Sequence, residues 1–321
     1  MSENRKQGMS VIVPFLNEEE GIFLFCDTFD SFVSSLGFPV ELIFVNDGSS
    51  DRSLNRISEY VFKNVEKVKV INLSKNYGSH AAIRAGLTKA EYDICTWIGS
   101  DLQEPLIIIP TAYEKITKEK YDAVYIEKKS VVVSKVNRFF SKAYSRMMQK
   151  YAVKNYSSGG TSTIVFNHKI KDYLNDNIEG NSSIMLQIMD AGFNCCQLSL
   201  DFNERKAGDS KWTLSKKIKL LIDSFVAFSY MPIRLVSVIG FCIFFIGCII
   251  GLVVLVNRFT NPNVPLGYST LACLIALGFG ITNISLGIIA EYLWRTYDAA
   301  MKRPVFIIDE EIKVKGYDES N

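Results

Sequence analysis

The chain has 321 residues, of which 48% are hydrophobic, and its formal net charge at pH 7 is only +2. This length allows one large domain or two smaller ones. Because 36 Lys and Arg residues are nearly balanced by 34 Asp and Glu residues, no general electrostatic attraction to nucleic acid is expected. The seven cysteines show no metal-ligand or disulfide spacing, so we expect them to be reduced, small apolar residues.

The front of the chain alternates short apolar runs with helical patterns. Strands are expected at Ser10–Val13, at Val40–Val45, in VKVINL and at the start of YDICTWIGSDLQEP. A helical pattern follows each of the first three strands, the first through about Leu36, the second from about Ser53 and the third from near Ser79. Strands that alternate with helices indicate βαβ units around a parallel sheet, and therefore an α/β fold.

Polar residues follow all four of these strands. The clusters are Asn17-Glu18, Asn46-Asp47-Gly48, Lys75-Asn76 and Asp101-Leu102-Gln103. Because parallel sheets bind ligands outside the carboxyl ends of their strands, the clusters are expected to form one binding site. The turn VNDGSSD is also common turn chemistry. Asp47 is nevertheless placed to hydrogen-bond a nucleotide base or ribose, and Asp51 to cap the next helix or support the site.

The middle of the chain is expected to continue this domain. The expected elements are a basic amphipathic helix at 131–150, a loop at 155–163, a strand near 164–166, a helix to about Leu174, a helix in SIMLQIMDAG and a strand in CCQLSLDF. In the polar loop that follows, Arg205 and Lys211 flank a flexible turn. These cations either lie in solvent or clamp phosphate groups, since arginine suits bidentate contact with phosphate.

Two long segments, Leu235–Val256 and Phe259–Ala290, contain no charged residue. At about 1.5 Å per residue, each can cross a hydrocarbon layer of roughly 30 Å as a helix. Basic residues flank the pair and the amino terminus lacks an apolar signal-peptide core, so both flanks are expected in the cytoplasm. A helical hairpin inside a protein core is the alternative, but both segments exceed the usual length of core helices.

The predicted organisation has four parts. They are a cytoplasmic α/β domain at 1–207, an amphipathic juxtamembrane segment at 208–232, two transmembrane helices within 233–293 (about 235–256 and 267–290), and a cytoplasmic C-terminal tail at 294–321. Lys216, Lys217 and Lys219 precede apolar residues in the juxtamembrane segment, which suits a helix at the membrane surface.

Asp101 is the sharpest candidate for chemistry. A nucleotide diphosphate is polyanionic, and its cleavage leaves further charge on the departing phosphate. A divalent cation held by a carboxylate neutralises that charge, and Mg²⁺ commonly uses one or two carboxylates together with phosphate oxygens. Asp101, at the carboxyl end of the fourth expected strand, supplies the minimum of one carboxylate. Gln103 is placed to orient this carboxylate or to contact phosphate.

At these residues the chain resembles the family 2 glycosyltransferases, specifically the membrane-bound polyprenyl-phosphate sugar synthases. The matching stretches are SVIVPFLNEEEGI, VNDGSSDRS, LSKNYGSHAAIRAGL, SDLQEP, DFNERKAGDSKW, FSYMPIRL and GIIAEYLWRTYDAAMKRPVFII, together with the two-span hairpin. The resemblance implies a Rossmann-like (GT-A) nucleotide-binding domain with a mostly parallel sheet on the cytoplasmic face of a multi-pass membrane protein, most simply in a bacterial inner membrane. It also implies a nucleotide-sugar donor, a polyprenyl (undecaprenyl or dolichyl) phosphate acceptor, Mg²⁺ or Mn²⁺ as cofactor, and self-association through the hairpin.

The motifs also assign roles to single residues. Pro14, Asn17, Glu18 and Asp47 would hold the nucleotide, joined at the same edge by Asn76; Asp101 would take the metal with Gln103 beside it; and Arg205, Ser210 and Lys211 would face the phosphates.

Two departures from the family pattern stand out. Gly99-Ser100-Asp101 replaces the usual Asp-Ala-Asp, and residues 155–169 contain neither aspartate nor arginine where the family tends to place them. Weaker metal affinity, a different metal geometry or altered donor choice would each be compatible with these changes. A general base is not essential, because a phosphate monoester has a second pKa of roughly 6 and is largely ionised near neutral pH.

The sequence therefore predicts an inverting transferase that moves a sugar onto polyprenyl phosphate for export and glycan modification, such as that of cell-surface polysaccharides. A transferase that acts on a lipid-linked saccharide is an alternative, but its hydroxyl acceptor would need a base and no good candidate is evident. A non-catalytic membrane protein that binds a nucleotide sugar is a third possibility, favoured by Gly99 and the depleted loop.

Overall fold

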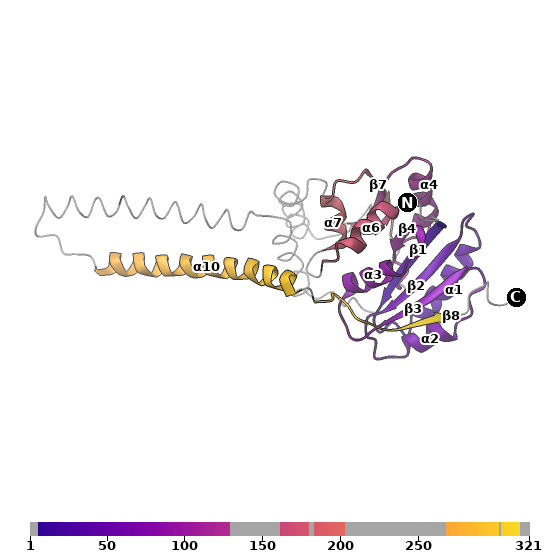
Figure 1. Cartoon of the computed structure of the whole chain (residues 1–321), viewed down its shortest axis with the longest axis horizontal. Helices are drawn as coiled ribbons and strands as arrows, with labels where there is room; N and C mark the ends of the chain where they lie inside the picture. The colour runs from indigo at the N-terminus through magenta and orange to yellow at the C-terminus, as the bar shows by residue number, and fades with distance from the viewer. Residues whose placement is uncertain are drawn as a thin grey trace, which may run out of the picture. The chain divides into compact units, whose positions relative to one another are not determined.

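The structure, a computed structural model, describes residues 6–128, 161–179, 183–202, 249, 268–301 and 303–314. The chain divides into two compact units, one made of Met1–Lys219 with Pro304–Asn321 and the other of Leu220–Arg303. The first unit is built on a single eight-stranded sheet (Figure 1).

The strands of this sheet lie in the order β7-β5-β6-β4-β1-β2-β3-β8. Their bounds are β1 Lys6–Phe15, β2 Val40–Asn46, β3 Lys67–Leu73, β4 Tyr92–Trp97, β5 Ala123–Lys128, β6 Thr161–Phe166, β7 Cys195–Leu200 and β8 Ile308–Val314. Strands β4, β1, β2 and β3 pair in parallel, as do β5 and β7, whereas β6 and β8 pair antiparallel to their neighbours. The predicted α/β domain with a mostly parallel sheet is therefore confirmed.

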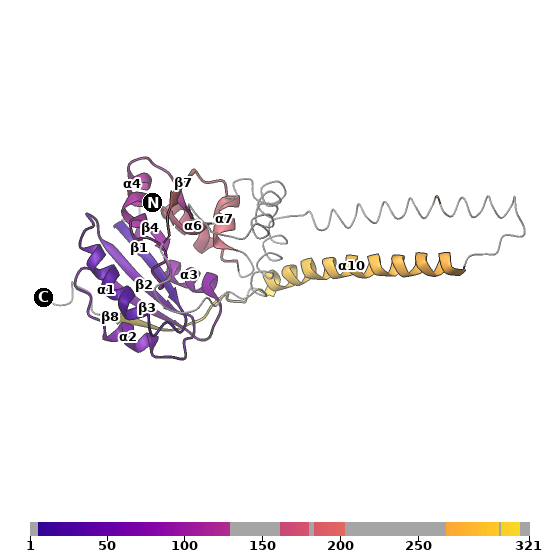
Figure 2. The same cartoon turned by 180° about the vertical axis from the view of Figure 1, so that it is seen from behind.

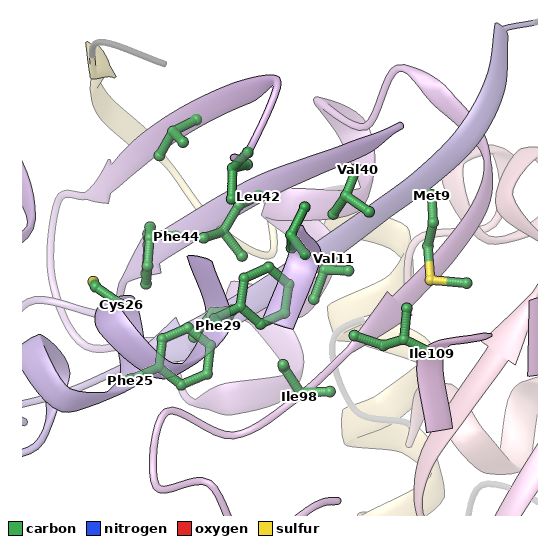
Figure 3. Close-up of a cluster of buried hydrophobic side chains, with 14 of the residues drawn as sticks. Met9, Val11, Phe25, Cys26, Phe29, Val40, Leu42, Phe44, Ile98 and Ile109 are labelled. Atoms are coloured by element: carbon green, nitrogen blue, oxygen red, sulfur yellow. The ribbon is translucent and has the colours of Figure 1, made fainter. Parts of the chain in front are cut away.

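Helices cover both faces of the sheet (Figures 1 and 2). The helices described in this unit are α1 Ile22–Val33, α2 Ser53–Glu59, α3 Ser79–Thr88, α4 Ile108–Thr117, α6 His168–Asp176 and α7 Ile184–Asp190. On one face, Phe25 and Phe29 of α1 stack at 5.6 Å and pack with Val11 of β1 and Phe44 of β2 (Figure 3). Their spacing of four residues places both rings on the same side of α1, which explains why this helix forms against the sheet.

A network of charged side chains lies toward the amino-terminal ends of β1, β2 and β3. Glu41 of β2 is fully buried and forms an ion pair with Lys69 of β3 at 2.8 Å. The same carboxylate accepts hydrogen bonds from Ser10 Oγ at 2.7 Å and from the Glu91 backbone N–H at 2.9 Å. Because a buried charge is costly unless it is paired and hydrogen-bonded, this network fixes the mutual register of β1, β2 and β3.

Strand β8 is a feature that the sequence analysis did not anticipate. The sequence indicated a separate tail at 294–321, whereas the structure pairs Ile308–Val314 antiparallel with β3 (Figure 1). Along β8 the apolar side chains of Ile312 and Val314 alternate with charged ones and join the core. Glu311 also forms an ion pair with Lys89 at 2.8 Å. The edge of β3 is covered by a segment that lies more than two hundred positions later in the chain, so local pattern gave no sign of the pairing.

The second unit contains α10, which spans Tyr268–Met301 and is 34 residues long. In the part of the chain that the structure describes, no helix has both the length and the hydropathy needed to cross a membrane. Large apolar side chains on α10 are exposed, namely Leu271, Leu274, Ile275, Phe279, Ile284, Leu286, Ile289, Leu293, Trp294, Tyr297 and Met301.

Several expected segments lie outside the described residues. These are the basic helix at 131–150, the juxtamembrane segment at 208–232 and, apart from Ile249, the first predicted span at about 235–256. The second predicted span, about 267–290, overlaps α10. The transmembrane hairpin is not confirmed and stays a prediction.

Candidate active site

The carboxyl ends of β1, β2, β3 and β4 lie at one edge of the sheet. The register pairs Phe15 with Asn46 across β1 and β2, and Asn46 with Asn72 across β2 and β3. Because these strands are parallel neighbours, the loops that follow them emerge side by side. The loops contain Asn17, Asp47, Asn76 and Asp101, so the predicted gathering of polar residues at one edge is confirmed.

Hydrogen bonds between backbone N–H groups and side-chain oxygens join the loops after β1 and β2. Asn17 has a left-handed backbone with φ of 52°, a conformation that asparagine tolerates better than most residues. Its N–H donates to Ser49 Oγ at 2.9 Å, and its Oδ1 accepts from the Ser50 N–H at 2.8 Å. The Glu18 N–H donates to Ser53 Oγ at 2.8 Å. Asn17 therefore links the loop after β1 to the loop after β2, and its role toward a nucleotide stays a prediction.

Asp51 braces the same pair of loops. Its Oδ1 accepts from the Ser53 N–H at 3.0 Å and from Ser53 Oγ at 2.6 Å, at the start of α2. Its Oδ2 accepts from the Glu19 N–H at 3.1 Å. A short acceptor at a helix start satisfies backbone donors that the helix itself leaves unpaired. Asp51 thus supports the site, which is one of the two roles that its position suggested.

Asp47 organises the loop between β3 and α3. Its side chain is only 4% exposed, and its two carboxylate oxygens accept the N–H groups of Tyr77 at 2.7 Å and Gly78 at 2.9 Å. Burial raises the pKa of Asp47, although the two backbone hydrogen bonds act in the opposite direction. The next residue, Gly48, has φ of +73°, and a Cβ there would lie 2.7 Å from the Asn76 backbone nitrogen. The two loops are therefore in direct backbone contact.

Asp101 lies in a tight turn after β4. Leu102 has a left-handed φ of 56°, and the Gln103 N–H donates to Asp101 Oδ1 at 3.3 Å. Asp101 and Gln103 are both partly buried. A Cβ built on Gly99 would lie 2.9 Å from Asp101 Oδ1, so the turn brings the carboxylate back over Gly99.

Glu104 is a candidate that the sequence analysis missed. Its Oε2 accepts from the Gly99 N–H at 3.3 Å, and its Oε1 accepts from Thr163 Oγ1 of β6 at 3.3 Å. Burial, and then the neighbouring charge of Asp101, raise the pKa of the Glu104 carboxyl. The available signal was the acidic residue inside the same SDLQEP run as Asp101, but its direction is set by the turn at Leu102.

The other predicted site residues fall into two groups. Pro14 lies in β1 and is partly buried, Glu18 is partly buried and Asn76 is exposed; all three lie at the same edge. Arg205, Ser210 and Lys211 lie outside the described residues. Among the described residues, no three His, Cys, Asp or Glu side chains are grouped so as to hold a metal ion. The converging oxygens of Asp101 and Glu104 nevertheless match the hard, oxygen-rich donor set that Mg²⁺ and Mn²⁺ favour.

Helix α3 begins at this edge and carries two basic groups, of which His80 is partly buried and Arg84 is buried. Burial lowers the pKa of His80 to about 4. Burial also lowers the pKa of Arg84 to about 10, and Arg84 Nη2 donates to Gln187 Oε1 of α7 at 2.8 Å. Arg84 is 1% exposed, so this contact fastens α3 to α7 behind the loops of the site.

The chain is similar to several known proteins. The undecaprenyl-phosphate 4-deoxy-4-formamido-L-arabinose transferase of Proteus mirabilis (strain HI4320) is 28% identical over 309 residues, which cover 96% of this chain and 94% of that protein. A solved glucosyl-3-phosphoglycerate synthase from Mycobacterium tuberculosis, in complex with Mn²⁺, UDP and phosphoglyceric acid, is 18% identical with a TM-score of 0.46, covering 68% of this chain and 76% of that chain.

Two further matches define the family. The uncharacterized glycosyltransferase YkcC of Bacillus subtilis (strain 168) is 30% identical over 316 residues, which cover 96% of this chain and 95% of that protein. The family model described as "Glycosyl transferase family 2" matches residues 10–186, more than half of the 321-residue chain. The matched range includes β2, β3, β4, most of β1 and every loop that forms the described site. The chain, with its mixed and mostly parallel sheet, therefore belongs to glycosyl transferase family 2.

Proposed function

We propose that this glycosyltransferase moves a sugar from a nucleotide diphosphate to a polyprenyl phosphate, with inversion at the anomeric carbon. The observation that carries the proposal is the meeting of four polar loops at the carboxyl edge of β1 to β4, with the carboxylate of Asp101 among them. A relative that aligns over nearly the whole chain is named for transfer to undecaprenyl phosphate, which supports the same class of acceptor here.

The nucleotide is proposed to bind over the loops after β1, β2 and β3. Asn17 and Asp47 hold these loops rigid through backbone hydrogen bonds, and the exposed side chain of Asn76 lies on the loop that Asp47 braces. A rigid, prearranged edge reduces the entropy lost when the donor binds. Pro14 and Glu18 complete the proposed nucleotide edge, and Ser210 is proposed to join Arg205 and Lys211 at the phosphates.

The donor diphosphate is proposed to lie next to Asp101. A bound Mg²⁺ or Mn²⁺ would supply charge neutralisation for the departing diphosphate. Asp101 would hold that ion, and Gln103, whose backbone N–H is bonded to Asp101, would keep the carboxylate oriented. Metal dependence is part of the proposal, and loss of turnover on addition of a chelator would test it.

The acceptor phosphate is proposed to attack without a protein base. With a second pKa of roughly 6, a phosphate monoester is mostly a dianion at neutral pH, so no proton has to be removed. Its oxygen forms a bond to the anomeric carbon while the bond to the donor's diphosphate breaks, and the pair of electrons leaves with the nucleoside diphosphate. Attack from the face opposite the leaving group inverts the anomeric configuration.

We also propose that the protein is a multi-pass protein of the bacterial inner membrane, with its α/β domain in the cytoplasm. The absence of charge from Leu235–Val256 and Phe259–Ala290, with basic residues on both flanks, supports this placement. A lipid phosphate would then be presented to the α/β domain at the inner leaflet. Self-association through the proposed hairpin would be compatible with this arrangement.

The decisive experiment incubates the purified full-length protein with a panel of nucleotide sugars and undecaprenyl phosphate, with and without EDTA. A sugar-phosphate-lipid product that disappears with EDTA and returns with Mn²⁺ supports the proposal. Product only when a lipid-linked saccharide replaces the phosphate overturns it in favour of the second transferase class. Binding of a donor without turnover on either acceptor would indicate a non-catalytic protein.

A further inference from the structure

Gly99 lies where the family pattern has an acidic residue, and the surrounding space accounts for the glycine. Its φ lies outside the left-handed region, so the backbone itself would accept a side chain. Space, however, is short. A Cβ at this position would lie 2.9 Å from Asp101 Oδ1 and 3.3 Å from Glu104 Oε2. Two carboxylate oxygens therefore converge on the volume that a side chain at position 99 would begin to fill.

Glu104 is held in this direction from two sides. Its Oε2 accepts the Gly99 N–H and its Oε1 accepts Thr163 Oγ1, both at 3.3 Å. Thr163 is fully buried in β6, so this contact anchors the carboxylate to the sheet rather than to a surface loop. The direction of Glu104 toward Asp101 is thus a property of the folded domain, and the glycine leaves the space that it needs.

Two carboxylates that converge in a partly buried turn repel one another, and a divalent cation between them would offset this repulsion. We propose that Glu104 supplies the second carboxylate of the divalent-cation site, in the place of the acidic side chain that Gly99 lacks. The inference rests on the proposed function, because that proposal assigns the cation to Asp101. The chain has then moved the second carboxylate from position 99 to position 104 rather than lost it.

The test measures Mn²⁺ binding to the full-length protein by the loss of the free-ion EPR signal, without donor or acceptor. Glu104→Gln keeps the size of the side chain and an acceptor for the Gly99 N–H, so it preserves a merely structural role. We expect it to weaken Mn²⁺ affinity by roughly tenfold or more, as loss of a ligand or its close support does. Glu114→Gln removes the same charge from an exposed, ion-paired position on α4 and should leave the affinity unchanged.

A relocation variant makes the test sharper. Gly99→Asp combined with Glu104→Ala places a carboxylate at 99 and removes one of the two carboxylates that a side chain there would approach, while Asp101 stays as the partner ligand. We expect it to bind Mn²⁺ within roughly threefold of the natural protein, and more tightly than Glu104→Ala alone. If relocation brings no gain over Glu104→Ala, the inference is overturned. Should this variant fail to fold, the comparison of Glu104→Gln with Glu114→Gln decides the question alone.

Asp101→Asn separates this inference from the proposed function. If Asp101→Asn abolishes Mn²⁺ binding while Glu104→Gln binds as tightly as the natural protein, the role of Glu104 is refuted and the metal role of Asp101 is kept. If Asp101→Asn changes neither Mn²⁺ affinity nor turnover, the metal site of the proposed function is refuted, and the inference fails with it.

Discussion

Asp47→Asn is expected to loosen the loop between β3 and α3 without unfolding the domain. In the natural protein, the carboxylate accepts the Tyr77 N–H on one oxygen and the Gly78 N–H on the other. An asparagine retains one acceptor oxygen but presents an N–H₂ donor in place of the second. One buried backbone donor then faces another donor, and its hydrogen bond is lost.

The free energy cost of Asp47→Asn follows from two opposing contributions. A hydrogen bond to a charged acceptor is worth about 1.5–3 kcal/mol. The amide is uncharged, however, and the raised pKa of Asp47 shows that burial disfavours the native carboxylate, so part of the loss is offset. We expect a net cost of about 1–2 kcal/mol, which corresponds to roughly fivefold to thirtyfold more frequent opening of the loop.

Hydrogen–deuterium exchange read by mass spectrometry measures this opening directly. Peptides that cover residues 74–79 should exchange faster in Asp47→Asn by the factor above, while peptides from β1 should not change. Asp190→Asn, which makes the same chemical change at an exposed position in α7, serves as the control. Because the loop carries Asn76, the donor KM should rise with the exchange rate while kcat stays within about threefold.

Unchanged exchange in residues 74–79 would refute the assignment of Asp47 as the brace of this loop. Faster exchange throughout the sheet would also contradict it, because that pattern indicates global destabilisation rather than local opening. A raised donor KM with unchanged exchange would instead point to direct contact between Asp47 and the nucleotide.

Three further predictions concern the rest of the α/β domain. Because burial lowers the pKa of His80 from 6.5 to about 4, the imidazole costs no stability above pH 6.5, where it is neutral in both states, and lowers stability as the pH falls toward 4, where only the unfolded state binds the proton. The free energy of unfolding should drop by up to about 3 kcal/mol over this window, and His80→Gln should flatten that slope. Lys69→Met leaves the buried Glu41 without its 2.8 Å ion-pair partner and should destabilise the domain by about 3–5 kcal/mol in denaturant titrations. Adding Glu41→Gln should recover part of this loss, and equal stability of the natural protein and Lys69→Met would contradict the role of the pair. Deletion of residues 304–321 removes β8 and the hydrogen bond from the Ser74 N–H to the Ile307 carbonyl. Hydrogen–deuterium exchange of the β3 amides should therefore rise and donor affinity should fall, whereas unchanged protection of β3 would show that β8 is dispensable.

Much of the site was predictable because its residues lie at the ends of short apolar runs. The position of Asp47 after a buried strand predicted its place at the edge where the polar loops gather, and the same reasoning located Asp101. The sequence did not predict that Asp47 would accept hydrogen bonds from the loop between β3 and α3, since its partners are backbone groups about 30 positions later in the chain. The sequence pattern likewise gave no reason to choose Glu104 over its neighbours, because the left-handed backbone at Leu102 decides where that carboxylate points.

Periodicity, strand-end chemistry and family motifs in the sequence were sufficient to determine the α/β class, the parallel core and the edge at which the polar loops gather. Local spacing records which segments form strands and helices, and the alternation of strands with helices favours parallel pairing of the strands. The tertiary structure alone decided that Ile308–Val314 completes the sheet and that Thr163 of β6 orients Glu104 toward Asp101. Both join segments far apart in sequence, and the free energy that selects such pairings arises only when the whole core is packed.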